Sequence, residues 1–120
     1  MKRAPNILWL DEPEEHDYPA ALSYLTLLYD PEKATALVTL LRKARLVTYK
    51  AKDIIRASGL YPIGAVNFHV KHNLKKIAEK KALSPVLLIR GERLIIADGW
   101  HRVNAIYLLN EDADIPCHIV

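Results

Sequence analysis

The sequence predicts an α+β fold, in which a small mixed β-sheet is packed by helices and extended at the N-terminus by an α-hairpin. Two short runs rich in Val, Leu and Ile, at residues 86–89 and 94–97, are separated by a turn that contains Gly91. Such runs predict the two strands of a β-hairpin. Apolar residues at helical spacing over residues 18–29 and 31–44 predict two N-terminal helices. We expect the whole chain of 120 residues to be one domain.

The N-terminal part begins with an apolar run at residues 7–10, which is either a strand or a packed arm. An acidic loop follows at residues 11–17. We expect this loop to be solvated and to supply charge at a helix N-terminus rather than to bind a cation. The first helix is expected to turn Leu22, Leu25 and Leu28 inward.

The second helix has a clear start, because Asp30 suits the N-cap and Pro31 suits the first helical position. Its apolar stripe is regular and comprises Ala34, Leu37, Val38, Leu41 and Ala44. We expect the two helices to pack as an α-hairpin on the rest of the domain, or to form the surface of a homodimer.

The middle of the chain alternates short elements. A strand is predicted at residues 46–50, a short helix at 52–58 that ends at Gly59, and a loop at 60–68. A helix is predicted at residues 70–81. Its inward positions are Val70, Leu74, Ile77 and Ala78, and its outer faces carry Lys71, Lys75, Lys76, Lys80 and Lys81.

The residues after the second strand of the hairpin are the best candidates for a functional site. Asp98 and Gly99 lead directly into a helix, whose first turn has free N–H groups and the positive end of the helix dipole. Gly99 lets a ligand approach the backbone closely, while His101 and Arg102 add donors and positive charge. These cations are unfavourable at a helix start unless an anion, or a carboxylate such as Asp98, balances them. We therefore predict a phosphate site here.

Two residues of this segment have alternative interpretations. Asp98 is either an ordinary N-cap or a ligand for Mg²⁺ or a substrate hydroxyl beside the phosphates. Trp100 either stacks on a base or sugar, or covers the edge of the core. In the functional interpretation, Asp98 and His101 are the catalytic candidates.

The sequence Gly-Trp-His-Arg at residues 99–102 lies between a buried strand and an apolar helix, and the strand-like Ile-Pro-Cys-His-Ile-Val follows at 115–120. Leu-Ser-Pro-Val at residues 83–86 and Val-Asn-Phe-His at 66–69 precede it. This arrangement resembles the ParB/sulfiredoxin superfamily, whose members have Gly-x-His-Arg at the head of a helix and a closing Val/Ile-Pro strand. The resemblance covers residues 45–120.

The resemblance divides the domain into an N-terminal helical extension, residues 1–45, and a ParB/sulfiredoxin-like core, residues 46–120. It implies that Gly99 to Arg102 hold nucleotide phosphates, and that the neighbourhood of Ser84 and Lys80 lines the nucleotide pocket. His69 lies at an Arg-like position of the family, which implies a contact to a phosphate or a base.

The sequence also departs from the family. Trp100 replaces the Cys that sulfiredoxins have between the Gly and the His, so we do not expect peroxiredoxin repair. ParB proteins continue into a helix-turn-helix domain, whereas this sequence stops at Val120, so we do not expect centromere-site recognition.

Composition and charge restrict the class of protein. A hydrophobic content of 51% and a charged content of 26% are ordinary for a globular domain. A single cysteine excludes an internal disulfide, and no apolar run has the length of a membrane span or a signal peptide, so we expect a cytoplasmic protein without a membrane partner. Residues 33–97 contain fourteen Lys or Arg and three Asp or Glu, a balance of +11. This basic segment suits a nucleotide, a phosphometabolite or weak, non-specific contact with nucleic acid.

The remaining candidates favour structural roles. His69 and His72 have a spacing that a metal could use, but no Cys, Asp or Glu is near them in sequence to complete a set. Cys117 alternates with Ile115 and Ile119, which predicts a buried small hydrophobe on a strand.

These observations favour a nucleotide-binding protein, either an ATPase or a small-molecule phosphotransferase. In this hypothesis Gly99 to Arg102 hold the phosphates of ATP or CTP, and Asp98 serves Mg²⁺ or the acceptor. One alternative is a ParB-like nuclease or other DNA-associated protein that uses the lysine helix at 70–81, although that stretch has no aromatic residue for base stacking. Another is a non-catalytic nucleotide switch whose N-terminal hairpin dimerises or binds a partner.

Overall fold

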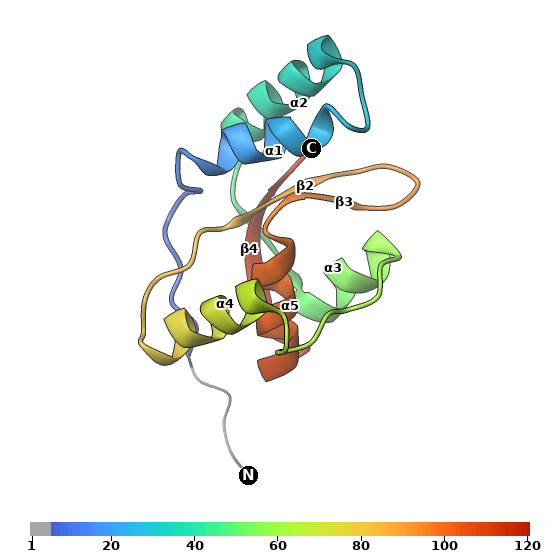
Figure 1. Cartoon of the computed structure of the whole chain (residues 1–120). Coiled ribbons are helices and arrows are strands. Elements are labelled where there is room, and N and C mark those ends of the chain that lie inside the picture. The colour runs from blue at the N-terminus through green and yellow to red at the C-terminus, as the bar shows by residue number, and fades with distance from the viewer. Residues whose placement is uncertain (1–5) are drawn as a thin grey trace.

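The computed structural model describes residues 6–120, which form a mixed α+β domain as predicted (Figure 1). Five helices surround a four-stranded sheet with strand order β1-β4-β2-β3 within these residues. None of these helices is long and apolar enough to span a membrane. In chain order the elements are α1 (Asp17–Leu25), α2 (Pro31–Lys43), β1 (Val47–Lys50), α3 (Ala51–Ser58), α4 (Phe68–Ala78), β2 (Val86–Ile89), β3 (Ile95–Asp98), α5 (Trp100–Leu109) and β4 (Asp114–Ile119).

The sheet is mixed because β4 pairs antiparallel with β1 and parallel with β2, while β2 and β3 form the predicted antiparallel hairpin. All four residues of β2 are buried. Val86 and Leu88 belong to the core on one face of the sheet, and Leu87 and Ile89 belong to the core on the other. This alternation explains why β2 is a continuous apolar run, since helices cover both of its faces.

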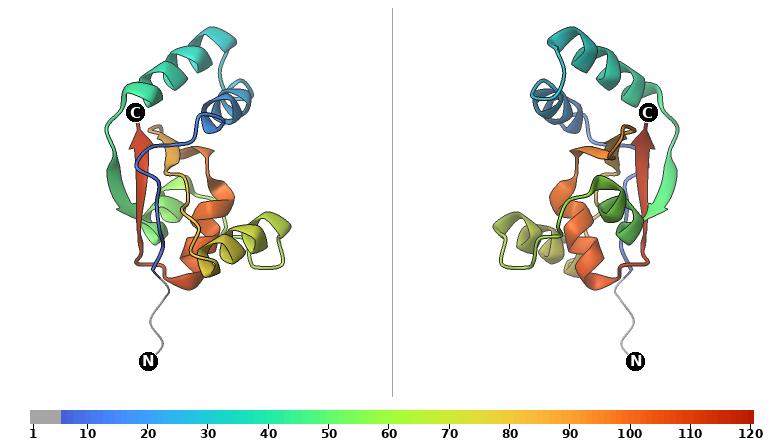
Figure 2. Two further views of the ribbon diagram at one scale, coloured as in Figure 1. Left: turned by 90° about the vertical axis from the view of Figure 1, so that its left-hand side faces the viewer. Right: turned by 90° about the vertical axis from the view of Figure 1, so that its right-hand side faces the viewer.

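The first face of the sheet is covered by α3 and α5, and α4 packs against the outer side of α5 (Figures 1 and 2). Val103 and Ile106 of α5 are fully buried against the sheet. Val70 and Ile77 are the buried residues of α4. Cys117 is buried in the same core, as the alternation in β4 predicts.

The second face is covered by the α-hairpin of α1 and α2, which lies across β2 and β3 (Figure 2). Leu25 and Leu41 are fully buried between these helices and the sheet. The buried His118 Nδ1 donates to the carbonyl oxygen of Leu41 at 2.7 Å, which fixes the end of α2 to β4. Asp30 caps α2 as predicted, accepting from the N–H of Lys33 at 2.8 Å.

Three details differ from the sequence-based expectations. The helix α1 ends at Leu25, so Leu28 lies in the following turn and is 48% exposed rather than buried. The helix α4 begins at Phe68 because the side chain of Asn67 caps it, accepting from the N–H groups of two residues in the first turn. It ends at Ala78, which is exposed instead of turned inward.

The N-terminal run is a packed arm, which was one of the two alternatives. Trp9 forms an isolated parallel bridge with Leu83, and the Leu10 N–H donates to the Leu83 carbonyl at 2.8 Å. Further along, the Glu14 N–H donates to Ser84 Oγ at 3.0 Å. The arm thus leads the acidic loop to the segment between α4 and β2.

Candidate functional site

The candidate site is built around Arg102, in the first turn of α5. Its Nη2 donates to Asp98 Oδ2 at 2.7 Å, and its Nη1 lies 3.4 Å from Asp17 Oδ2. The Arg102 side chain is only 13% exposed, so both carboxylates neutralise a largely desolvated guanidinium. Asp17 also accepts a short hydrogen bond from the hydroxyl of Ser84. The network thus joins three segments that are distant in sequence.

This network corrects the interpretation of Asp98 as an N-cap. Asp98 is the last residue of β3, and the N-cap of α5 is Gly99, which has no side chain to accept from the first turn. The β2–β3 register shifts between Leu87 and Leu88, so that Leu87 pairs with Asp98 while Leu88 pairs with Ile96. A bulge of this kind re-aims the side chain beside it. Here Asp98 points its carboxylate at Arg102.

Gly99 is required by both its conformation and its surroundings. Its φ of +110° is unfavourable for other residues. A Cβ at this position would also collide with Val86, whose own Cβ would be only 2.9 Å away. The glycine therefore brings the start of α5 directly against β2.

A cleft of about 370 Å³ opens at this helix start, and we refer to it as the histidine cleft. It collects four of the five histidines of the chain, from the acidic loop, from α4 and from α5. The imidazole rings of His69 and His101 lie with their centroids 4.7 Å apart. The lining also includes groups of both charges, and its ionisable members are Glu14, His16, Asp17, His69, His72, Lys76, Asp98, His101 and Arg102.

Most of the predicted site residues meet at this cleft. Gly99 to Arg102, Asp98, Ser84 and His69 all line it. Lys80 does not line it, because it follows the end of α4 in a turn with a φ of +58°. Lys76, one turn earlier on α4, takes the place expected for Lys80.

The sequence-based reasoning missed several residues of the cleft. His72, Asn73 and Lys76 line it from α4 beside the predicted His69, and their spacing of three and four residues from His69 and His72 is a local signal for one helix face. Asp17 has no such signal. We expected the acidic loop to be solvated, which is wrong for Asp17, because its carboxylate is buried against Ser84 and Arg102.

Two pKa shifts decide the proton chemistry of the site. Burial raises the pKa of Asp98 to about 6; the charge of Asp17 adds to this shift, and the guanidinium of Arg102 opposes it. Burial and the neighbouring His69 lower the pKa of His101 below its ordinary value of 6.5. Near neutral pH, Asp98 is therefore close to its titration point and His101 is largely an uncharged imidazole that can accept a proton.

The residues do not fit a resident metal ion. Asp98 already accepts from Arg102, and no group of three or more His, Cys, Asp or Glu side chains in residues 6–120 is placed to hold a metal. Thiol chemistry is equally unsupported, because burial raises the pKa of Cys117 to about 11 and keeps the thiol protonated.

A second, larger cleft of about 730 Å³ adjoins the first, and we refer to it as the tyrosine cleft. The two clefts share Ala20 and the run from Asp98 to His101. Tyr24 and Tyr29, from the region of α1 and the turn after it, line its other side. The start of α5 therefore lies between a charged space and a more aromatic one.

Searches of protein-family models, of curated proteins and of solved structures each find no match to this chain.

Proposed function

We propose that this protein binds a phosphorylated small molecule at the histidine cleft, and that the ligand is a nucleotide such as ATP or CTP. The observation that carries the proposal is the convergence of His69, His72 and Lys76 on the uncapped N-terminus of α5. Free helix N–H groups, imidazoles and an ammonium group are the donors that phosphate oxygens prefer.

The ion pairs of the cleft indicate which of these donors are available. Arg102 is held by Asp98 and Asp17, so its charge is already balanced. Lys76 has no carboxylate within ion-pair distance among residues 6–120, although it is partly buried in the cleft. We therefore assign direct phosphate contact to Lys76, the imidazoles and the backbone, and a positioning role to Arg102.

The tyrosine cleft provides room for the rest of a nucleotide. Trp100 lines both clefts, and Tyr24 is 42% exposed on the far side of the second one. Aromatic side chains stack on bases with little dependence on sequence. In the proposal, the phosphates lie beside Lys76 and the base lies between these aromatic residues.

We further propose that the bound nucleotide is turned over, either by hydrolysis of ATP or by transfer of a phosphoryl group to a small acceptor. His101 would accept the proton of the attacking hydroxyl or water, since its lowered pKa leaves it uncharged. The departing phosphate of the nucleoside diphosphate would take that proton as the phosphoryl group leaves it. No step of the proposal depends on a metal held by the protein.

The resemblance to the ParB/sulfiredoxin superfamily supports the same assignment. It rests on the position of Gly99 to Arg102 at the head of α5, directly after a buried strand. We propose membership of that superfamily on this ground.

Nucleic-acid binding is a second candidate, and one observation favours it. Because α4 begins at Phe68, this lysine-rich helix does have an aromatic residue, and its side chain is 75% exposed. Phe68, Lys71 and Lys75 share a helix face, so a single strand could stack on the ring beside two ammonium groups.

The test is a thermal-shift titration with ATP, CTP and GTP, with and without Mg²⁺, on the natural protein and on two variants. We expect nucleotide to raise the Tm of the natural protein, because a ligand of the folded state stabilises it. Lys76→Ala should lose most of this increase. Lys71→Ala removes the same charge from the outer face of α4 and serves as the matched control.

A competition with single-stranded DNA at physiological salt separates the two candidates. If DNA binds with a dissociation constant well below the ~10⁻⁴–10⁻⁶ M typical of non-specific contact and no nucleotide binds, the nucleic-acid function replaces the proposal. Equal losses in Lys76→Ala and Lys71→Ala would contradict the assignment of the histidine cleft.

A further inference from the structure

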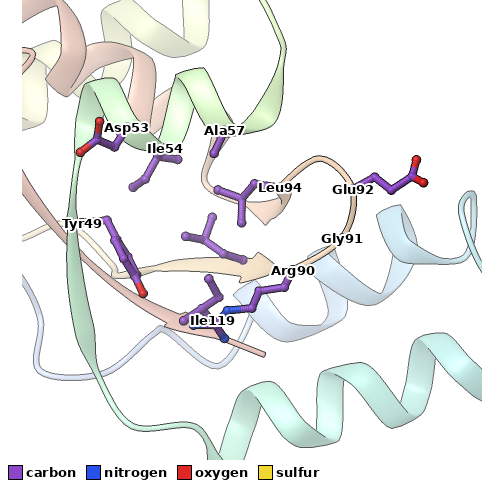
Figure 3. A pocket seen from close by; sticks show the side chains of 10 residues that line it. Tyr49, Asp53, Ile54, Ala57, Arg90, Gly91, Glu92, Leu94 and Ile119 are labelled. Carbon is purple, nitrogen blue, oxygen red and sulfur yellow. The ribbon is translucent and has the colours of Figure 1, made fainter.

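A third cleft, of about 510 Å³, lies along α3 and shares no lining residue with the histidine cleft (Figure 3). Its volume is within the range of small-molecule sites. Four elements surround it: β1, α3, the turn between β2 and β3, and the end of β4. No residue of the motif at the start of α5 lines it, and Leu94 is a lining residue that it shares with the tyrosine cleft.

The floor of this cleft is apolar. Ile54 from α3 and Leu88 from β2 are buried below it, and Leu94 and Ile119 are partly exposed at its sides. The Leu94 N–H donates to the Ala57 carbonyl at 2.9 Å, which ties the turn to α3 and keeps the two walls in place. A ligand that fits here must present a hydrophobic body.

One end of the cleft is cationic. The Arg90 backbone is fixed by its N–H bond to the Val120 carbonyl at 2.7 Å, and its side chain turns back across Ile119 toward the Tyr49 side (Figure 3). Within residues 6–120 no carboxylate lies within 4.0 Å of the Arg90 guanidinium. The guanidinium therefore has its donors free at the edge of an apolar surface.

The acidic residues of the rim define how much negative charge the cleft accepts. Asp53 is occupied by Arg56 at 2.9 Å, and Glu92 points away from the cleft (Figure 3). Both carboxylates would repel a polyanion such as a nucleotide. A single negative charge beside Arg90 is compatible with them.

We propose that this cleft binds a small apolar monocarboxylic acid, with its hydrocarbon body on the floor and its carboxylate on Arg90. The hydroxyl of Tyr49 lies on the same side of the cleft and supplies a second donor. Arg presents paired N–H groups that match the two oxygens of a carboxylate, which a neutral head group does not use.

The experiment is an NMR titration of the ¹⁵N-labelled full chain with octanoate. Octanol serves as the neutral ligand with the same body, and acetate as the anion without one. We expect octanoate to shift the amide signals of Ala57, Leu88 and Ile119 while leaving Gly99 and His101 unchanged. Both reference ligands should bind at least about tenfold more weakly.

Two variants complete the test. Arg90→Gln should weaken octanoate binding by about tenfold, whereas Arg93→Gln, in the same turn but outside the cleft, should leave it unchanged. Ala57→Leu should block the cleft, and its NMR spectrum shows whether it folds. The proposal is overturned if octanoate does not bind, if it shifts the α5 signals instead, or if the two arginine variants behave alike. The outcome can be distinguished from phosphate binding at the histidine cleft, with which this cleft shares no lining residue.

Discussion

The two faces of the sheet are covered by different parts of the chain. The buried core of the face under α3 and α5 comes from residues after β1, and it includes Leu88 and Ile106; Trp9 of the N-terminal arm packs against its edge. The opposite face, with Leu87 and Ile89, is covered by α1 and α2. Because β2 is buried on both sides, the N-terminal hairpin is a necessary layer of the fold and not an appendage to a complete domain.

Both layers also contribute residues to the candidate site. The layer formed by α3 and α5 supplies Arg102, and β3 supplies Asp98, but the second partner of Arg102 comes from α1. Asp17 is thus the residue through which the N-terminal layer reaches the start of α5. Stability and site geometry should therefore respond to changes on either face.

The largest expected effect comes from equal truncations on the two faces. We expect Leu41→Ala, under α2, and Ile106→Ala, on α5, each to lower the free energy of unfolding by about 4 kcal/mol, because both side chains are fully buried. The measurement is chemical unfolding followed by circular dichroism and by tryptophan fluorescence. Both tryptophans pack on the α5 side of the sheet. Fluorescence therefore reports the α5 layer, whereas circular dichroism reports the helices of both layers.

The unfolding of Leu41→Ala tests directly whether the two layers of the fold depend on each other. If both layers form one cooperative unit, the two signals of this variant change together at a lower denaturant concentration. A separate, earlier loss of the helical signal with unchanged fluorescence would show instead that the hairpin is an independent appendage.

Local patterns in the sequence were sufficient to predict most elements. The run at 86–89, the Asp30 cap and the Gly59 stop each depend on neighbouring residues, and each lies where we expected it. The prediction that Leu28 points inward was wrong, because α1 ends one turn early, after Leu25. Periodicity alone does not show where a helix stops.

The candidate site was predictable only in part, because sequence patterns reveal residues that are close together in the chain and not pairs that the fold brings together. Gly99 to Arg102 are adjacent in sequence, so a short motif reveals them. The bond between Ser84 and Asp17 spans 67 positions and the pair of Arg102 with Asp17 spans 85. No local spacing indicates such pairs, and the acidic loop therefore looked like ordinary solvated charge.

An intermediate effect is expected from removing the contact between the layers. Asp17→Ala should cost about 3 kcal/mol, because it removes the carboxylate acceptor of the buried Ser84 hydroxyl and one of the two carboxylates that neutralise the desolvated Arg102. Asp30→Ala removes an exposed capping carboxylate from the same hairpin and should cost only about 1 kcal/mol. Thermal and chemical unfolding of both variants measure the difference. Equal costs would mean that Asp17 acts only as charge at the start of α1.

The smallest expected effect is a dependence of the free energy of unfolding on pH. It comes from Asp98, whose pKa is shifted by charged groups of both layers, Arg102 and Asp17. Its pKa is raised from 3.8 to about 6 by burial and by Asp17 of the other layer. The folded protein therefore binds more protons than the unfolded chain between these values, and the stability contributed by protonated Asp98 is lost as the pH rises from about 4 to 6. The full difference corresponds to roughly 3 kcal/mol, and we expect about 2 because the side chain is 20% exposed.

Asp98→Asn tests this expectation, because it keeps an acceptor for Arg102 and cannot ionise. Relative to the natural protein, the variant should gain about 2 kcal/mol of stability between pH 4 and pH 7, measured as the difference between the two unfolding curves at each pH. Taking the difference removes the titration of all other groups. In the background of Asp17→Ala the gain should shrink, since the repulsion from the other layer is absent. A constant difference at all pH values would show that folding does not shift the pKa of Asp98, so that Asp98 is fully ionised near neutral pH and has no part in proton transfer.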